Sequence, residues 1–265
     1  MHVSRSGLFR WATRNRTNRE KREQEQREHI REVHRQHDSV YGSRKVYQVL
    51  RQRGIEIGHN RVARLMRREG LCGRWKPRRR PQSTFSRDAM YENVIQRRFS
   101  VTQPNALWLT DFTHIAVQNG TLHLAVVLDM YARRVVGWAT SPVRADVARE
   151  AVFRALMRRK TQPGLVLHSD RGSEYTGSEM ANLVQRYGIR RSFSAVGECY
   201  DNAPMESFFH LLKAEIGPLK RVRYETAHRT IARYIEQFYN ELRIHSANGY
   251  RSPAQIEARY NYGTA

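Results

Sequence analysis

The sequence predicts an α/β protein in which helices pack against a mixed sheet, preceded by an all-α region of the helix-turn-helix type. Three observations support this fold class. From residue 104 onward, strand-like runs alternate with helical patterns. Before that point the apolar spacing is helical only. Between them, residues 72–100 are rich in Arg, Pro and Ser, as is typical of a linker. The predicted organisation is therefore a helical region (1–71), a basic linker (72–100) and an α/β domain with a C-terminal helix (101–265).

The helical region opens with a charged helix and a short amphipathic one. Residues 14–39 interleave Arg, Glu and Gln with few apolar positions, which is typical of a helix with a solvated face. Val46, Val49 and Leu50 then repeat at helical spacing. The glycine-flanked stretch 54–58 ends that pattern.

A second short helix is predicted after this break. Asn60 can cap it, while Val62, Leu65 and Met66 face inward. Its outward side carries four candidate DNA contacts, Arg61, Arg64, Arg67 and Arg68. Two short helices of which the second is basic suggest a helix-turn-helix. An ordinary helical hairpin with a solvated basic face fits the same pattern.

The charge distribution points to a polyanionic partner. Lys and Arg outnumber Asp and Glu by 47 to 25, a net charge of +22, and residues 1–100 hold 26 of the basic residues against 10 acidic ones. Such a field favours nucleic acid over a membrane surface. No apolar run approaches the roughly 20 residues that a membrane span needs. The linker motif KPRRRPQS adds three candidate phosphate contacts, Arg78, Arg79 and Arg80.

The α/β part begins with three predicted strands, at 107–115, 121–128 and 134–139, with a tight turn at 118–120. Helices and strands then alternate. They are a helix at 145–159, a strand at 165–168, a helix at 178–187, a strand at 189–194 and a helix at 202–216. A long helix at 226–244 precedes the C-terminal segment.

Three acidic residues of this part could meet at one edge of the sheet. Asp111 lies inside the first strand, Asp170 follows the fourth in HSDRGSEY, and Glu206 lies on a helix in DNAPMESFFHLLK. An ionised carboxylate within a strand is costly unless compensated, and a divalent cation is one compensation. For any one acid taken alone, a cap, a turn or a salt bridge is the more common explanation. Local turns or caps account for Asp129 and Asp201, which are set aside.

The helix that carries Glu206 has a polar side. At about 100° per residue, Asn202, His210 and Lys213 fall within about 40° of Glu206. The apolar residues Met205, Phe208, Leu211, Leu212 and Ile216 occupy the other side. We therefore expect Glu206 and Lys213 together at the rim of the sheet.

The spacing of these residues carries a resemblance to a known family. Thirty-five residues separate Asp170 from Glu206, and Lys213 comes seven after Glu206. Here the chain resembles the DDE transposases and integrases of the retroviral-integrase superfamily, and more closely the second-frame protein of the IS3 family of insertion sequences. The matching stretches are WLTDFTHI, VVLDMYARRVVGW, HSDRGSEY, CYDNAPMESFFHLLKAE and FYNELRIHSANGYRSPAQIE, with VSRSGLFRW and YGSRKVYQVL upstream.

The resemblance implies a ribonuclease-H-like catalytic domain in which Asp111, Asp170 and Glu206 hold two Mg²⁺ or Mn²⁺ ions. Water would nick the donor DNA, and a 3′-hydroxyl would then join the strands. Lys213 would hold a phosphate or base near the scissile bond, and Asn202 and His210 are further candidate DNA contacts. Glu174 departs from the family, since relatives often carry glutamine there.

The resemblance also implies partners and a location. Double-stranded DNA is expected as the substrate, both the terminal repeats of the element and the target. A homo-oligomer on DNA, an upstream-frame partner or fusion, and a nucleoid-associated cytoplasmic location without membrane contact are expected too. Two other functions fit less well. A nuclease of the same fold that cuts without joining would not need Lys213 or the basic front region. A catalytically decayed DNA-binding regulator predicts a damaged acid, yet all three are present.

Overall fold

The computed structural model describes residues 17–75, 92–161, 163–195 and 199–263. The chain divides into two compact units, Met1–Arg74 and Trp75–Ala265. None of the helices in the described ranges is both long enough and apolar enough to cross a membrane.

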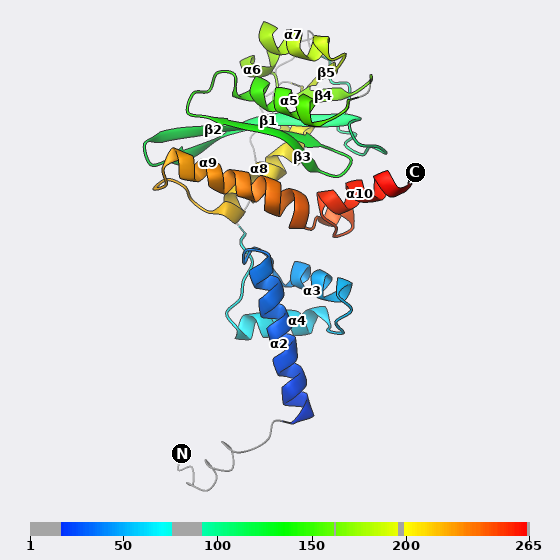
Figure 1. Cartoon of the computed structure of the whole chain (residues 1–265), viewed down its shortest axis with the longest axis vertical. Helices are drawn as coiled ribbons and strands as arrows, with labels where there is room; N and C mark the ends of the chain where they lie inside the picture. Colours follow the sequence, from blue (N-terminus) through cyan, green and yellow to red (C-terminus); the bar gives the residue numbers. More distant parts are fainter. Residues whose placement is uncertain (1–16, 76–91, 162, 196–198, 264–265) are drawn as a thin grey trace. The chain divides into compact units, whose positions relative to one another are not determined.

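The described part of the first unit consists of three helices (Figure 1): α2 (Asn18–Gln36), α3 (Ser43–Gln52) and α4 (His59–Arg68). Thr17 and Glu20 form a capping box at the start of α2, in which each side chain accepts a bond from the backbone N–H of the other. The predicted helix over 14–39 is therefore confirmed for 18–36, and residues 14–16 lie outside the described ranges.

The prediction that Asn60 caps the second short helix is wrong. α4 begins at His59, its N-cap residue is Gly58, and no side chain caps it. Glycine is tolerated at an N-cap because it adopts the extended conformation needed there without a side-chain cost. Asn60 therefore lies within the first turn of α4, where it is exposed.

The first unit has a small apolar core of its own. All the residues predicted to face inward on the two short helices are buried: Val46, Val49, Leu50, Val62, Leu65 and Met66. α2 adds Ile30 and Val33, which are fully buried. α2 is therefore solvated on only part of its surface, and it closes a core that two short helices could not cover alone.

The second unit is built on a five-stranded sheet. Its strands are β1 (Leu107–Val117), β2 (Gly120–Asp129), β3 (Arg134–Ser141), β4 (Val166–Ser169) and β5 (Arg190–Phe193). The strand order is β3-β2-β1-β4-β5. The three long strands pair antiparallel, whereas β4 pairs parallel with β1 and β5 parallel with β4. The mixed sheet confirms the predicted fold class, and its central strand is the one that carries Asp111.

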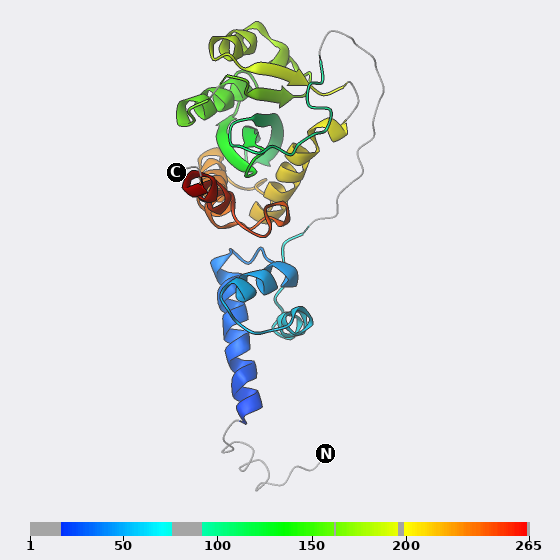
Figure 2. The ribbon, with the colours of Figure 1, turned by 90° about the vertical axis from the view of Figure 1, so that its right-hand side faces the viewer.

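Helices cover both faces of this sheet (Figures 1 and 2). One side carries α5 (Val147–Arg158), α6 (Ser173–Thr176) and α7 (Ser178–Arg186), and the other carries α8 (Ala203–Ile216) and α9 (Tyr224–Arg233). The chain ends its described part in α10 (Pro253–Gly263).

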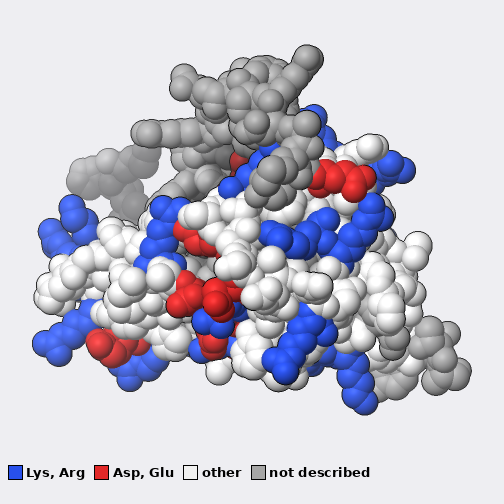
Figure 3. All heavy atoms as spheres, turned by 90° about the horizontal axis from the view of Figure 1, so that it is seen from above, with Lys and Arg blue, Asp and Glu red and all other residues white. Residues whose placement is uncertain are grey.

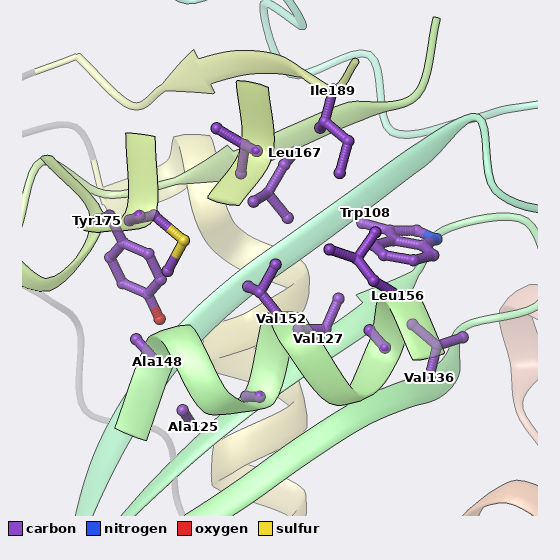
Figure 4. Packing of buried hydrophobic residues seen from close by; sticks show 14 of the residues in the cluster. Trp108, Ala125, Val127, Val136, Ala148, Val152, Leu156, Leu167, Tyr175 and Ile189 are labelled. Atoms are coloured by element: carbon purple, nitrogen blue, oxygen red, sulfur yellow. The ribbon is translucent and has the colours of Figure 1, made fainter. Parts of the chain in front are cut away.

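The main core lies between α5, α7 and the sheet (Figure 4). Trp108 of β1 and Val127 of β2 belong to the same buried cluster as Val152 of α5. Close approach of α5 depends on Gly137 of β3, because a Cβ at that position would collide with the backbone and side chains of α5. Burying side chains of this size stabilises the fold by about 1.5–3 kcal/mol each.

The long helix predicted at 226–244 is present but irregular. It begins as α9 and continues as the π-helical stretch η2 (Tyr234–Leu242). In this stretch Asn240 faces β3, where its amide accepts from Val135 N at 3.0 Å and donates to Val135 O at 2.9 Å. Apolar spacing alone does not reveal the wider turn, since it depends on this contact with the sheet.

Part of the expected linker packs against the second unit. Residues 92–98, here called the strap, run beside the end of β5. Glu92 O accepts from Phe193 N at 3.0 Å, and Val94 N donates to Ser192 Oγ at 3.0 Å. Ile95 is buried. The strap therefore lies close to the end of the sheet where Asp170 follows β4.

Candidate active site

Asp111 and Asp170 are brought together by the parallel pairing of β1 with β4. The last residues of this pairing are Leu109 and His168, and each acid follows two residues later. Both side chains are half-buried. The sheet register therefore places one acid beside the other, as the sequence analysis expected.

The environment of Asp111 disfavours its charged form. Its carboxylate accepts one bond, from Phe112 N at 2.8 Å. Burial, together with the charges of Asp170 and Glu206, raises the pKa of Asp111 to about 7, although Lys213 acts in the opposite direction. Burial is the main cause of this shift, and the two neighbouring carboxylates add to it.

Asp170 forms a turn as well as facing Asp111. Its Oδ1 accepts from Gly172 N at 3.0 Å, which is the local bond expected of an aspartate in a turn. Burial raises the pKa of Asp170, and Glu174 adds to this while Arg144 opposes it. Glu174 forms an ion pair with Arg144. Burial acts to raise the pKa of Glu174, but Arg144 outweighs it and the pKa is lowered.

Two contacts hold α8 beside β1 and so place Glu206. Asn202, the N-cap residue of α8, donates from Nδ2 to Thr110 O at 3.3 Å. One end of the helix is thereby fixed next to Asp111. About three turns further on, Lys213 Nζ donates to Thr113 Oγ1 at 2.6 Å. Thr113 lies on the same face of β1 as Asp111, since side chains alternate along a strand.

The three carboxylates have the chemistry to bind a hard divalent cation, although their side chains do not form a compact metal site. Within the described ranges, no group of three or more His, Cys, Asp or Glu side chains lies close enough together to bind a metal ion. The side-chain oxygens of Asp111, Asp170 and Glu206 are the ligand type that Mg²⁺ and Mn²⁺ prefer. Asn202 Oδ1 is also buried, and no donor from the described residues reaches it.

Comparisons with known proteins show the family. Residues 101–199 and 187–253 match two models named Integrase core domain, and residues 21–80 match an HTH-like domain. Transposase InsF for insertion sequence IS3A of Escherichia coli is 36% identical over 272 residues, covering 97% of this chain and 91% of the relative. The transposase for insertion sequence element IS904 of Lactococcus lactis is 37% identical over 243 residues, covering 88% and 93%. The chain belongs to the IS3 family of transposases.

The IS3-family transposase is also similar to solved integrase structures. One is the HTLV-2 integrase catalytic core domain in complex with magnesium, with 17% identity, a TM-score of 0.45, and coverage of 58% of this chain and 96% of that chain. Another is the simian T-cell lymphotropic virus intasome in complex with a PP2A regulatory subunit, with 14% identity, a TM-score of 0.49, and coverage of 82% and 70%. The family matches alone assign the transposase to the enzymes of the transposase and integrase class.

Two acids that the sequence analysis set aside are structural in this transposase. Asp129 is fully buried and accepts from Tyr131 N at 2.9 Å and Asn105 N at 2.8 Å, so the local turn is confirmed. Asp201 is buried too, but it does not cap the helix. It accepts from two residues distant in sequence, Asn93 and Arg97, and from Ala195 N six residues before it. The capping interpretation of Asp201 is wrong.

The polar side of α8 differs in part from the prediction. Glu206, His210 and Lys213 are half-buried at the rim, but Asn202 is only 6% exposed. Its burial favours a positioning role over contact with DNA. On the other side of α8, Leu211 and Ile216 are only half-buried, while Phe209 and Glu215 are buried and were not expected to be.

The four candidate arginines of α4 have different surroundings. Arg61 donates to Gln26 at 2.6 Å and lies 3.5 Å from the Glu23 carboxylate, and Arg68 lies 3.4 Å from the same carboxylate. Arg64 and Arg67 are exposed and form no ion pair with any described residue. The linker candidates Arg78, Arg79 and Arg80 lie outside the described residues.

Sequence reasoning missed two residues beside the acids. Tyr175 is 1% exposed, and its hydroxyl lies 3.3 Å from Thr110 Oγ1, directly next to Asp111. Thr113 is the partner of Lys213. Strand alternation places Thr113 on the face of Asp111, so its position could have been predicted. Tyr175 could not, because it reaches β1 from a four-residue helix that has no periodic signal.

Proposed function

We propose that this transposase nicks the ends of its insertion sequence and joins them to target DNA with a metal-dependent site formed by Asp111, Asp170 and Glu206. The parallel pairing of β1 with β4 that sets Asp111 beside Asp170, in a chain of the IS3 transposase family, carries the proposal. Burial and two neighbouring carboxylates disfavour the charged form of Asp111, and an oxygen-seeking cation is the compensation that would restore it. A purely structural acid is expected to have its oxygens bonded as those of Asp129 are, by two backbone N–H groups, whereas Asp111 accepts from Phe112 N alone within the described ranges.

Two Mg²⁺ or Mn²⁺ ions at these carboxylates would activate the attacking oxygen and stabilise the leaving one in an in-line displacement. The chain contributes one rigid strand, one turn and one helix, which supply Asp111, Asp170 and Glu206 respectively. Water serves as the nucleophile for nicking and a 3′-hydroxyl for joining, so no covalent protein intermediate is required.

Lys213 and His210 are proposed to contact the DNA near the scissile bond. The ammonium group of Lys213 is held at Thr113, two residues beyond Asp111 on the same strand face. A cation fixed there can bind a phosphate or a base without moving the carboxylates. Both basic and acidic side chains are exposed on the face shown in Figure 3.

The first unit is proposed to bind the DNA duplex through α4. Arg64 and Arg67 are exposed and lie on one side of the helix, so they can reach base edges or phosphates. Arg61 and Arg68 are engaged with Glu23, so we assign them mainly to holding α4 against α2. We accordingly divide the chain into three functional parts. They are a DNA-binding region (1–71), a basic linker (72–100) that contains Arg78, Arg79 and Arg80, and a catalytic domain (101–265).

Assembly on DNA is part of the proposal. The element has two ends that must be processed together, so we expect at least two copies of the transposase in the active complex, with an upstream-frame protein or fusion as a further partner. The family supports this expectation, since its members move a discrete element with two ends. The mass of the protein–DNA complex in solution measures the number of copies.

A product-mapping assay tests the proposed reaction. Purified transposase is incubated with Mg²⁺ and DNA carrying the ends of its element, and nicked and joined products are resolved on denaturing gels. Wild-type protein should yield both products, and Glu206→Gln neither, while both proteins bind DNA. Asp146→Asn is the matched control, because Asp146 is exposed and has a φ of 63°, a conformation that asparagine tolerates well. Joining by Glu206→Gln at the wild-type rate would overturn the proposal.

A further inference from the structure

Asp201 lies five residues before Glu206 and binds two other segments of the catalytic unit. Its carboxylate accepts from Asn93 Nδ2 and Arg97 Nε, both at 2.7 Å, and from Ala195 N at 2.9 Å. Its side chain is 3% exposed. Asn93 and Arg97 belong to the strap, and Ala195 follows β5. A buried carboxylate with this set of partners fixes the strap, the end of β5 and the start of α8 relative to one another.

The strap adopts a costly backbone conformation at this contact. Gln96 and Arg97 have φ values of 46° and 63°, in the left-handed region that L-residues avoid. Asn93 supports the turn, since its Oδ1 accepts from Gln96 N at 3.0 Å while its Nδ2 binds Asp201. Conformations of this kind persist only where the surroundings hold them. The strap is therefore shaped so that Arg97 reaches Asp201.

The contact acts on the part of α8 that carries Glu206. Asp201 lies in the 3₁₀ turn η1 (Cys199–Asn202), which leads directly into the helix. The next residue, Asn202, binds Thr110 O on β1. Asp201 and Asn202 thus fix the start of α8 from two directions. A shift of that first turn would move Glu206 relative to Asp111.

We propose that Asp201 and Arg97 are positioning residues that hold Glu206 in place for the metal-dependent reaction. This inference rests on the proposed role of Glu206. The strap thereby helps to support the active site, although the sequence predicted that this segment is only a linker. Arg97 itself is 51% exposed, so its ion pair adds little to the stability of the fold. Its loss is therefore expected to affect the site more than the fold.

Metal binding separates positioning from a merely structural role. We suggest titrating Mn²⁺ into Arg97→Gln and Asp201→Asn by calorimetry, and measuring single-turnover nicking across a range of Mg²⁺ concentrations. Outer contacts of metal ligands typically contribute roughly 10–100-fold in metal affinity or activity. We expect a loss of that size in Mn²⁺ affinity, with nicking recovered in large part at high Mg²⁺. DNA affinity and melting temperature of Arg97→Gln should stay near wild type, and Arg97→Lys should regain part of the affinity.

Arg190→Gln is the matched control. It removes one positive charge and the 3.3 Å ion pair between Arg190 and Glu92 of the strap, without touching Asp201. It should titrate Mn²⁺ like wild type. The double variant Arg97→Gln with Asp201→Asn should be no worse than Asp201→Asn alone, because both changes break one contact. Wild-type Mn²⁺ affinity in Arg97→Gln would overturn the positioning role. If Glu206→Gln also leaves Mn²⁺ affinity unchanged, the proposed metal site itself fails.

Discussion

At the residue scale, ionisation of the Asp111 carboxylate opposes folding. An unfolded aspartate ionises near pH 3.8, whereas Asp111 in the folded protein holds its proton up to about pH 7. Between these values the folded state binds the extra proton, so its stability falls as the pH rises from about 4 to 7. At about 1.4 kcal/mol for each unit of pKa, the loss is at most about 4 kcal/mol.

Asp111→Asn should therefore stabilise the ion-free protein at pH 8 and leave it nearly unchanged at pH 4. Asparagine does not ionise, so the variant avoids the loss that wild type suffers as the pH rises. Urea unfolding in EDTA at the two pH values measures the difference, and Asp146→Asn is the control. A variant less stable than wild type at pH 8 would show that the Asp111 carboxylate stabilises the fold instead of serving the site.

The residues themselves show how far the sequence could predict the site. Asp111 inside a strand, Asp170 after a strand and Glu206 on a helix could be singled out from the residues, but it is the resemblance to a known family that groups them. The partners of Asp201 could not be singled out, because Asn93 and Arg97 lie in a segment without periodic signal, over 100 residues away. The same limit applies to Tyr175, whose contact with Thr110 depends on tertiary packing.

At the element scale, α8 is buried on more sides than a single amphipathic stripe predicts. The reason is Glu215, which faces the segment after η2 and pairs with Arg243 through bonds of 2.6–3.1 Å. Tyr234 donates a further bond to the same carboxylate at 2.8 Å. The charge of Glu215 would assign it to solvent although its spacing puts it on the apolar side of α8, and its partner Arg243 lies 28 residues away, so this contact was not predictable.

Arg243→Ala should destabilise the protein by about 3–5 kcal/mol, because Glu215 would remain buried without its partner. Arg154→Ala is the control, since its pair with Glu150 is exposed and such pairs contribute less than about 1 kcal/mol. Chemical unfolding compares the two. Equal effects of both changes would show that the buried pair has no special role in fixing α8.

The arginines of α4 should divide into two classes. Arg64→Gln and Arg67→Gln should each weaken DNA binding and reduce the slope of log affinity against log salt by about one. Arg61→Gln should chiefly lower the melting temperature of the first unit, since it releases Gln26 and Glu23. Binding measured at several salt concentrations, together with thermal unfolding, tests this. An equal loss of affinity in all three variants would contradict the division.

At the scale of the whole molecule, most of the excess of basic over acidic residues lies in residues 1–100. A truncation that removes this charge should end before the strap, because the strap packs against the catalytic unit. Removing residues 1–91 should leave a folded catalytic unit with weak DNA binding and a shallow salt dependence. Removing residues 1–100 should also expose the end of β5, because it deletes Ile95 and the partners of Asp201. Circular dichroism and DNA titrations distinguish the two truncations. Unchanged DNA affinity after the shorter deletion would contradict the proposed role of the first unit.

The central claim is that the three carboxylates serve metal-dependent chemistry, and Asp170→Asn tests it most directly. Asparagine can accept the bond from Gly172 N that Asp170 accepts now, so the turn and the fold should be preserved. The negative charge is lost. The decisive measurement is strand joining by Asp170→Asn with end DNA and Mg²⁺, in a sample shown to be folded and to bind DNA like wild type. We predict a loss of joining by several orders of magnitude. Joining at a near wild-type rate would contradict the account and leave Asp170 as a turn residue only.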